Sequence, residues 1–135
     1  MGEEAKPVVT GVLLIALVAG WSAASAETPL GKTKCEIYKQ FGCSAVKCTE
    51  LDQPGKAWSV IDWDARDYDL CEPGNCQHFK FMPWEDGIYI SLTLPGRDLM
   101  VKINTTDNSI VETSTVLNYT ISSFGSCAKD EDEPK

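Results

Sequence analysis

The chain has 135 residues, of which 43% are hydrophobic and 24% are charged, and its formal net charge is −8. This size and composition fit one globular domain and leave no room for a second. The negative charge argues against nucleic acids and anionic membrane surfaces as partners, because both need clustered Lys and Arg.

The N-terminal stretch has the pattern of an export signal. An apolar run covers residues 8–21 and is followed by Ala24 and Ala26, which form an A-x-A cleavage signal. The run is shorter than the about 20 residues of a membrane-spanning helix. We expect 1–26 to be a signal peptide and the mature protein to be periplasmic or secreted. Two glutamates outnumber one lysine in the first six residues, so the usual positive charge of such a signal is missing. An uncleaved anchor is the alternative.

All six cysteines follow this segment. Residues 1–26 carry one net negative charge, so the mature chain without them has a formal charge of −7. An even number of cysteines in a small exported domain indicates disulfides. Fifteen pairings are possible, and we expect Cys43 with Cys48, Cys71 with Cys76, and Cys35 with Cys127. On the chain-entropy model the long bridge contributes roughly 4 to 5 kcal/mol and each short one about 2.

The first half of the mature chain predicts short strands separated by turns. Residues 35–39 place Cys35 and Ile37 on one face. Residues 41–54 are expected to be irregular. The stretch 57–64 is rich in β-forming residues and has a tryptophan on each face. Further strands are predicted at 68–71 and 77–82, and turns at 65–67, 72–75 and 83–87.

The second half shows clearer alternation of apolar and other residues. Strands are predicted at 88–94, where Ile90 and Leu92 share a face, and at 99–104, 109–115 and 119–127. Residues 128–135 are charged and lack large apolar side chains, so we expect a disordered acidic tail.

About eight short strands without helical periodicity predict an all-β fold. We expect a single β domain over 27–127, an antiparallel meander that closes into a small barrel or barrel-like sandwich stapled by disulfides. The interior of a barrel of this size is filled with side chains or holds one small ligand.

Several of these features together resemble a group of small exported bacterial proteins with cysteine-bridged β domains. They are the export signal, the early cysteine strand, the LPGR turn at 94–97 and the ending Ser123, Phe124, Gly125 and Cys127. This resemblance implies no particular activity. In architecture the chain is also similar to the small periplasmic barrels that inhibit lysozyme, but it lacks their Ser-Gly-x-x-Tyr segment.

The two closely spaced cysteine pairs and His78 superficially suggest zinc. Both pairs have four intervening residues, which is looser than the usual two-residue spacing, and an oxidising compartment favours disulfides. We therefore expect no bound metal and no other cofactor.

The acidic run Asp62, Asp64, Asp67 and Asp69 lacks the glycine and terminal glutamate of a calcium-binding EF-hand loop. We interpret it as a solvated turn. The alternative is a small hydrolase that uses the Asp62 and Asp64 carboxylates.

Aromatic residues lie among these acids and suggest a binding surface. Such residues are common interface anchors, although a small core also needs them. The candidate residues are Trp58, Trp63, Asp64, Tyr68, His78 and Trp84.

The absence of a G-x-S-x-G motif and the presence of one histidine argue against nucleophilic catalysis. The sequence thus predicts a monomeric, non-enzymatic protein that binds a protein partner or a small ligand. An inhibitor of a cationic cell-wall hydrolase is the further alternative, suggested by the negative charge.

Overall fold

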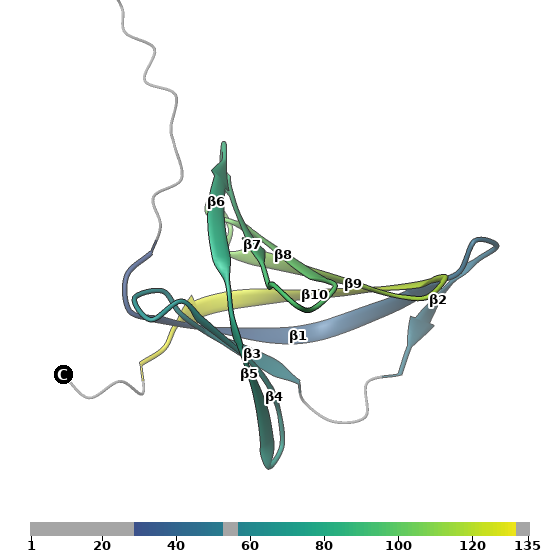
Figure 1. Ribbon diagram of the computed structural model, residues 1–135, viewed down its shortest axis with the longest axis horizontal. Coiled ribbons are helices and arrows are strands. Elements are labelled where there is room, and N and C mark those ends of the chain that lie inside the picture. Colours follow the sequence, from purple (N-terminus) through teal and green to yellow (C-terminus); the bar gives the residue numbers. More distant parts are fainter. Residues whose placement is uncertain (1–28, 53–56, 132–135) are drawn as a thin grey trace, which may run out of the picture.

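The computed structural model describes residues 29–52 and 57–131 (Figure 1), so the predicted signal peptide lies outside the described residues. Within these ranges the chain forms ten strands and no helix, and hence no helix that could cross a membrane. The strands are β1 (Lys32–Cys43), β2 (Cys48–Leu51), β3 (Trp58–Asp62), β4 (Asp67–Glu72), β5 (Asn75–Lys80), β6 (Met82–Asp86), β7 (Tyr89–Thr93), β8 (Leu99–Asn104), β9 (Ser109–Val116) and β10 (Tyr119–Lys129).

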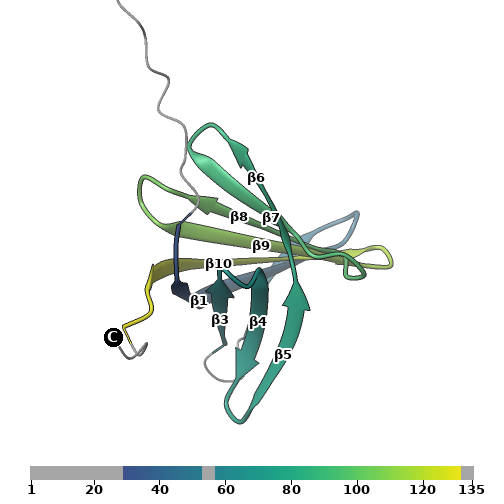
Figure 2. The ribbon, with the colours of Figure 1, turned by 60° about the vertical axis from the view of Figure 1, so that its left-hand side comes forward.

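All strand pairs are antiparallel and form one sheet in the order β5-β4-β3-β1-β10-β9-β8-β7-β6, with β2 also paired to β1. The sheet curls into a half-barrel. Figure 2 shows β3 to β5 on one side of the long strands β1 and β10, and β6 to β9 on the other. The all-β antiparallel prediction is confirmed, with ten strands in place of about eight.

The two end strands of the sheet, β5 and β6, follow one another in the chain with only Phe81 between them. Phe81 is buried, and its ring packs edge-on against that of Trp63 with 5.7 Å between the ring centres. Its backbone N–H donates to the Arg66 carbonyl. This residue therefore fixes the point where the chain passes from one edge of the half-barrel to the other.

Two segments expected to lack regular structure are strands. In 41–54, β1 continues to Cys43 and turns back into β2, because Cys43 and Cys48 face each other as a bridged cross-strand pair. In 83–87, the predicted turn is largely strand β6. Pro83 is tolerated there because β6 is an edge strand, where a missing N–H need not interrupt the ladder.

The core lies on the concave face of the sheet and follows the predicted alternation. It contains Cys35, Ile37, Ile61, Trp63, Tyr68, Phe81, Ile90, Leu92, Leu94, Leu99, Val101, Ile103, Ile110 and Cys127. Cys35 and Cys127 are directly opposed on β1 and β10, and they form a disulfide. The other bridges join Cys43 to Cys48 and Cys71 to Cys76, so the three pairs match those expected from the sequence.

A β-bulge in β1 changes which residues face inward. The register with β10 shifts between Ile37 and Lys39, so the residues opposite Ser123 and Ile121 are Gln40 and Gly42. Directly opposed residues share a face. The bulge therefore turns Gln40 to the same face as Cys35 and Ile37.

The C-terminal strand is longer than expected. β10 reaches Lys129, two residues into the predicted tail, and the N–H of Asp130 donates to the Lys32 carbonyl. Residues 132–135 lie outside the described part of the chain.

Candidate functional site

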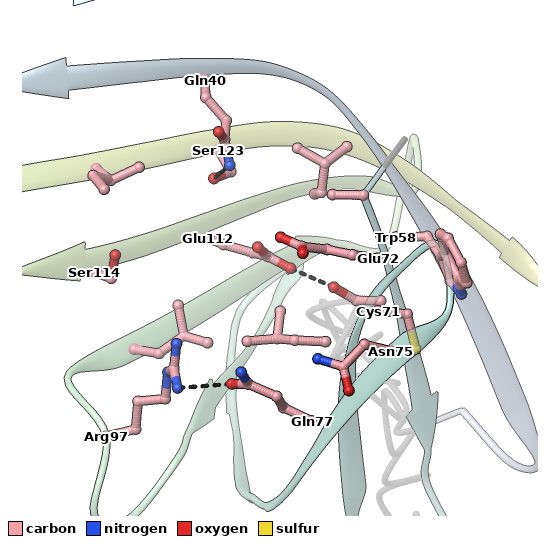
Figure 3. A pocket seen from close by; sticks show the side chains of 16 residues that line it. Gln40, Trp58, Cys71, Glu72, Asn75, Gln77, Arg97, Glu112, Ser114 and Ser123 are labelled. Carbon is pink, nitrogen blue, oxygen red and sulfur yellow. Dashed lines mark hydrogen bonds between the residues drawn. The ribbon is translucent and has the colours of Figure 1, made fainter. Parts of the chain in front are cut away.

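A pocket of about 380 Å³ opens on the concave face at one end of the half-barrel (Figure 3). Strands from both sides of the sheet line it, together with the LPGR turn between β7 and β8, which supplies Arg97. The apolar part of the lining includes Ile37, Leu70, Leu99 and Ile121. The polar part consists of Gln40, Ser59, Glu72, Asn75, Gln77, Arg97, Glu112, Ser114 and Ser123.

Glu112 is the most deeply buried charged residue of this lining, with 6% of its surface exposed. It lies on β9, where it shares the inward face with Ile110. Its Oε1 atom accepts a hydrogen bond of 2.6 Å from the Ser59 hydroxyl and a second one from the Tyr68 hydroxyl. These donors lie on β3 and β4, so the carboxylate links the two sides of the half-barrel.

Burial raises the pKa of Tyr68 well above its usual value, and the negative charge of Glu112 and the hydrogen bond to that carboxylate raise it further. An ionised tyrosine would place a second negative charge beside the first in an environment of low polarity. Tyr68 therefore remains a neutral donor to Glu112.

Two further polar side chains meet at the long central strands. Gln40 Nε2 donates to the Ser123 hydroxyl at 2.9 Å. Ser123 is buried and lies directly opposite Glu112 on the neighbouring strand. The bulge in β1 thus places the Gln40 side-chain amide on the inward face that also carries Ser123 and Glu112.

Arg97 lies across the opening between the two edges of the sheet. Its Nη1 atom donates to Gln77 Oε1 on β5 at 3.2 Å (Figure 3), and its guanidinium carbon lies 4.8 Å from the centre of the Phe79 ring. Both contacts hold the positive charge toward β5.

The charged side chains of the pocket are two carboxylates, Glu72 and Glu112, and one guanidinium, Arg97. The lining therefore carries one negative charge in excess. In the described part of the chain no group of three or more His, Cys, Asp or Glu side chains is placed to hold a metal ion.

A second pocket, of about 670 Å³, lies at the opposite end of β1 and β10. Its lining is largely apolar, including Leu30, Trp63, Ile90 and Ile103, and its charged group is Lys129. A hydrogen bond between two of its side chains joins Trp63 Nε1 to Thr33 Oγ1 at 2.9 Å, and among the described residues no carboxylate lines it. We take the first pocket as the candidate site because it contains a buried carboxylate with converging donors.

The aromatic and acidic residues singled out in the sequence do not form one surface. Trp63 and Tyr68 are buried in the core, because their strand positions face inward. Trp58 is half-buried and lines the edge of the first pocket, with Lys34 Nζ 5.7 Å from its ring centre. Trp84 is 56% exposed on β6, at the far edge of the sheet.

The acidic run is split among separate partners. Asp62 accepts a hydrogen bond from the N–H of Ala65, and Asp64 accepts one from the N–H of Gly31. Asp67 forms an ion pair with Lys80, and Asp69 lies 2.6 Å from His78 Nδ1. None of these four carboxylates lines either pocket.

Three important pocket residues were not predicted from the sequence. Glu112 is in phase with Ile110 along β9, so strand alternation could have identified it as an inward-facing acid. Ser123 is likewise in phase with Cys127. Gln40 had no such signal, because it faces inward only after the bulge.

Comparisons of the chain with protein-family models, with curated proteins and with solved structures found no significant match.

Proposed function

We propose that the protein is a non-enzymatic, extracytoplasmic binding protein that holds a small polar ligand in the pocket on its concave face. The observation that carries this proposal is the convergence of Glu112, Ser123 and Gln40 on a pocket whose wall also contains Ile37, Leu70, Leu99 and Ile121. Burying polar groups costs free energy unless they find partners. A hollow with apolar walls and a few convergent polar groups is typical of small-molecule sites.

The size of the pocket supports a ligand with few atoms. Ligand sites range from about 300 to 1,000 Å³, and the volume of about 380 Å³ lies near the lower end. The ligand is therefore of the size of a single amino acid, amine or sugar.

The disulfides favour a pocket that is preformed in the absence of ligand. The Cys71–Cys76 bridge ties β4 to β5, and these strands supply Glu72, Asn75 and Gln77 to the lining. A preformed site avoids the entropy cost of ordering on binding. The bridges also suit an oxidising compartment, and with the predicted signal peptide they support a periplasmic or secreted location.

A thermal-shift screen of small polar compounds, with one blocking variant and one matched control, tests the proposal. Ser114→Phe adds a ring inside the pocket, whereas Thr113→Phe adds it on the opposite face of the same strand. We expect ligands to raise the melting temperature of the wild type and of Thr113→Phe, but not of Ser114→Phe. A full response of Ser114→Phe, or no stabilising compound for the wild type, would refute the proposal.

A further inference from the structure

The buried carboxylate of Glu112 has one oxygen that the fold leaves open. Both hydroxyl donors bind Oε1. Among the described residues, no hydrogen bond or ion pair reaches Oε2, and Figure 3 shows the carboxylate pointing into the pocket. An oxygen that lines the pocket and has no partner within the described residues is available to a donor on a ligand.

The charge of Glu112 is also uncompensated. Ser59 and Tyr68 are neutral donors. The positively charged residue of the lining, Arg97, contacts Gln77 and Phe79 on β5. A buried charge is costly unless a charge of opposite sign accompanies it. A positively charged ligand removes this cost.

Glu72 adds a second carboxylate to the same pocket. It shares the inward face of β4 with Tyr68 and Leu70, and it lines the pocket from the side opposite β9. Two carboxylates can bind a cation from two directions. A bare divalent ion would require more ligands than these, whereas an organic cation also uses the apolar wall formed by Leu70, Leu99 and Ile121.

From this arrangement, and on the basis of the proposed function, we infer that the ligand is an organic cation with one ammonium or guanidinium group. Its N–H groups donate to Glu112 Oε2 and to Glu72, and its carbon chain lies against the apolar wall. Ser59 and Tyr68 are positioning residues, since they hold the carboxylate through Oε1 and leave Oε2 free. The same chemistry is offered by a free amine and by a lysine or arginine side chain.

NMR titration of the full chain with n-butylammonium tests this inference, with n-butanol as the neutral probe of equal length. Methylguanidinium tests the guanidinium group in place of the ammonium group. A blocked lysine peptide, compared with n-butylammonium, tests whether the cation is a side chain of a polypeptide or a free amine. Binding is followed at the Gln40 side-chain amide and at the backbone amides of Glu112 and Ser123. We expect n-butylammonium to bind at least tenfold more tightly than n-butanol.

Three variants that each remove one carboxylate then test which carboxylates bind the cation. Glu112→Gln and Glu72→Gln should each weaken n-butylammonium binding at least fivefold and leave n-butanol binding unchanged. Glu36→Gln removes the same charge from an exposed position on β1 outside the pocket, and it should change binding less than twofold. Glu72 is exposed, so this variant provides the test even if Glu112→Gln folds poorly.

The inference is wrong if n-butylammonium does not bind, if it binds no better than n-butanol, or if Glu36→Gln weakens binding as much as Glu72→Gln. A result that excludes the organic cation does not by itself exclude the proposed function. If neutral or anionic compounds bind and Ser114→Phe blocks them, the pocket is a binding site with another ligand class.

Discussion

A buried hydrogen-bonded cluster of Glu112, Ser59 and Tyr68 connects β9 to β3 and β4 across the interior. We predict that Tyr68→Phe lowers the free energy of unfolding by about 1.5 to 3 kcal/mol, because a buried carboxylate loses one of its two hydroxyl donors. Urea unfolding at pH 7 measures this change. Tyr89→Phe, which removes an exposed hydroxyl on β7, serves as the control and should stay within about 0.5 kcal/mol. Equal effects would contradict the role of the buried hydroxyl.

The raised pKa of Tyr68 predicts a loss of stability at alkaline pH. In the unfolded chain this tyrosine ionises near pH 10, whereas in the folded protein it stays neutral to higher pH. Its contribution is therefore complete below about pH 10 and is lost as the pH rises toward the folded-state value. The stability difference between the wild type and Tyr68→Phe should shrink above pH 10 in urea titrations. A constant difference up to pH 11 would refute this linkage.

At Gly125 strand β10 leaves no room for a side chain beside the backbone of β1. A Cβ atom at this position would lie 2.1 Å from the Glu36 carbonyl oxygen, which belongs to the backbone of β1. At Gly42 the nearest atoms belong instead to the Tyr119 side chain, which is 37% exposed and can move outward. We predict that Gly125→Ala costs at least about 3 kcal/mol and Gly42→Ala about 1 kcal/mol. Chemical denaturation of both variants tests this order, and a larger cost at Gly42 would contradict it.

Individual strands differed in how well the sequence predicted them, and the reason is physical. In strand β8 every second residue from Leu99 is buried and the residues between them are not, so its period is visible in the chain. Strand β6 contains Pro83 and acidic residues, and it forms a strand because β7 offers a pairing edge that no local pattern reveals. For the same reason the bulge between Ile37 and Lys39, which depends on pairing with β10, could not be predicted locally.

The three disulfides should contribute unequally to the stability of the whole molecule. The Cys35–Cys127 bridge spans a separation of 92 residues and lies in the core, whereas Cys71–Cys76 spans five. We predict a loss of roughly 4 to 5 kcal/mol for the Cys35→Ser/Cys127→Ser double variant and about 2 for Cys71→Ser/Cys76→Ser. Urea unfolding under oxidising conditions gives both values. The reverse order would show that loop length does not govern these bridges.

The fold class and the cysteine pairing could be predicted because both depend on alternation and on the spacing of a few residues. Alternation could have marked Glu112 and Ser123 as inward-facing, but the meeting of the site residues could not be predicted, because it arises from the curl of the complete sheet. Ser59, Tyr68 and Glu112 belong to distant segments that meet only when β3 and β4 face β9 across the interior. The aromatic residues divide between core and surface: alternation along the strands sends Trp63 and Tyr68 into the core, whereas Trp84 is exposed.

The whole molecule is a curled sheet with a polar pocket at one end, and our central claim is that this pocket is the binding site. The most direct measurement is a map of ¹H–¹⁵N chemical-shift changes on adding the compound that stabilises the protein most. The account predicts that the changes cluster at Gln40, Ser59, Glu112 and Ser123, and that they disappear in Ser114→Phe while persisting in Thr113→Phe. Changes concentrated on the outer face around Trp84, or unaffected by Ser114→Phe, would contradict it.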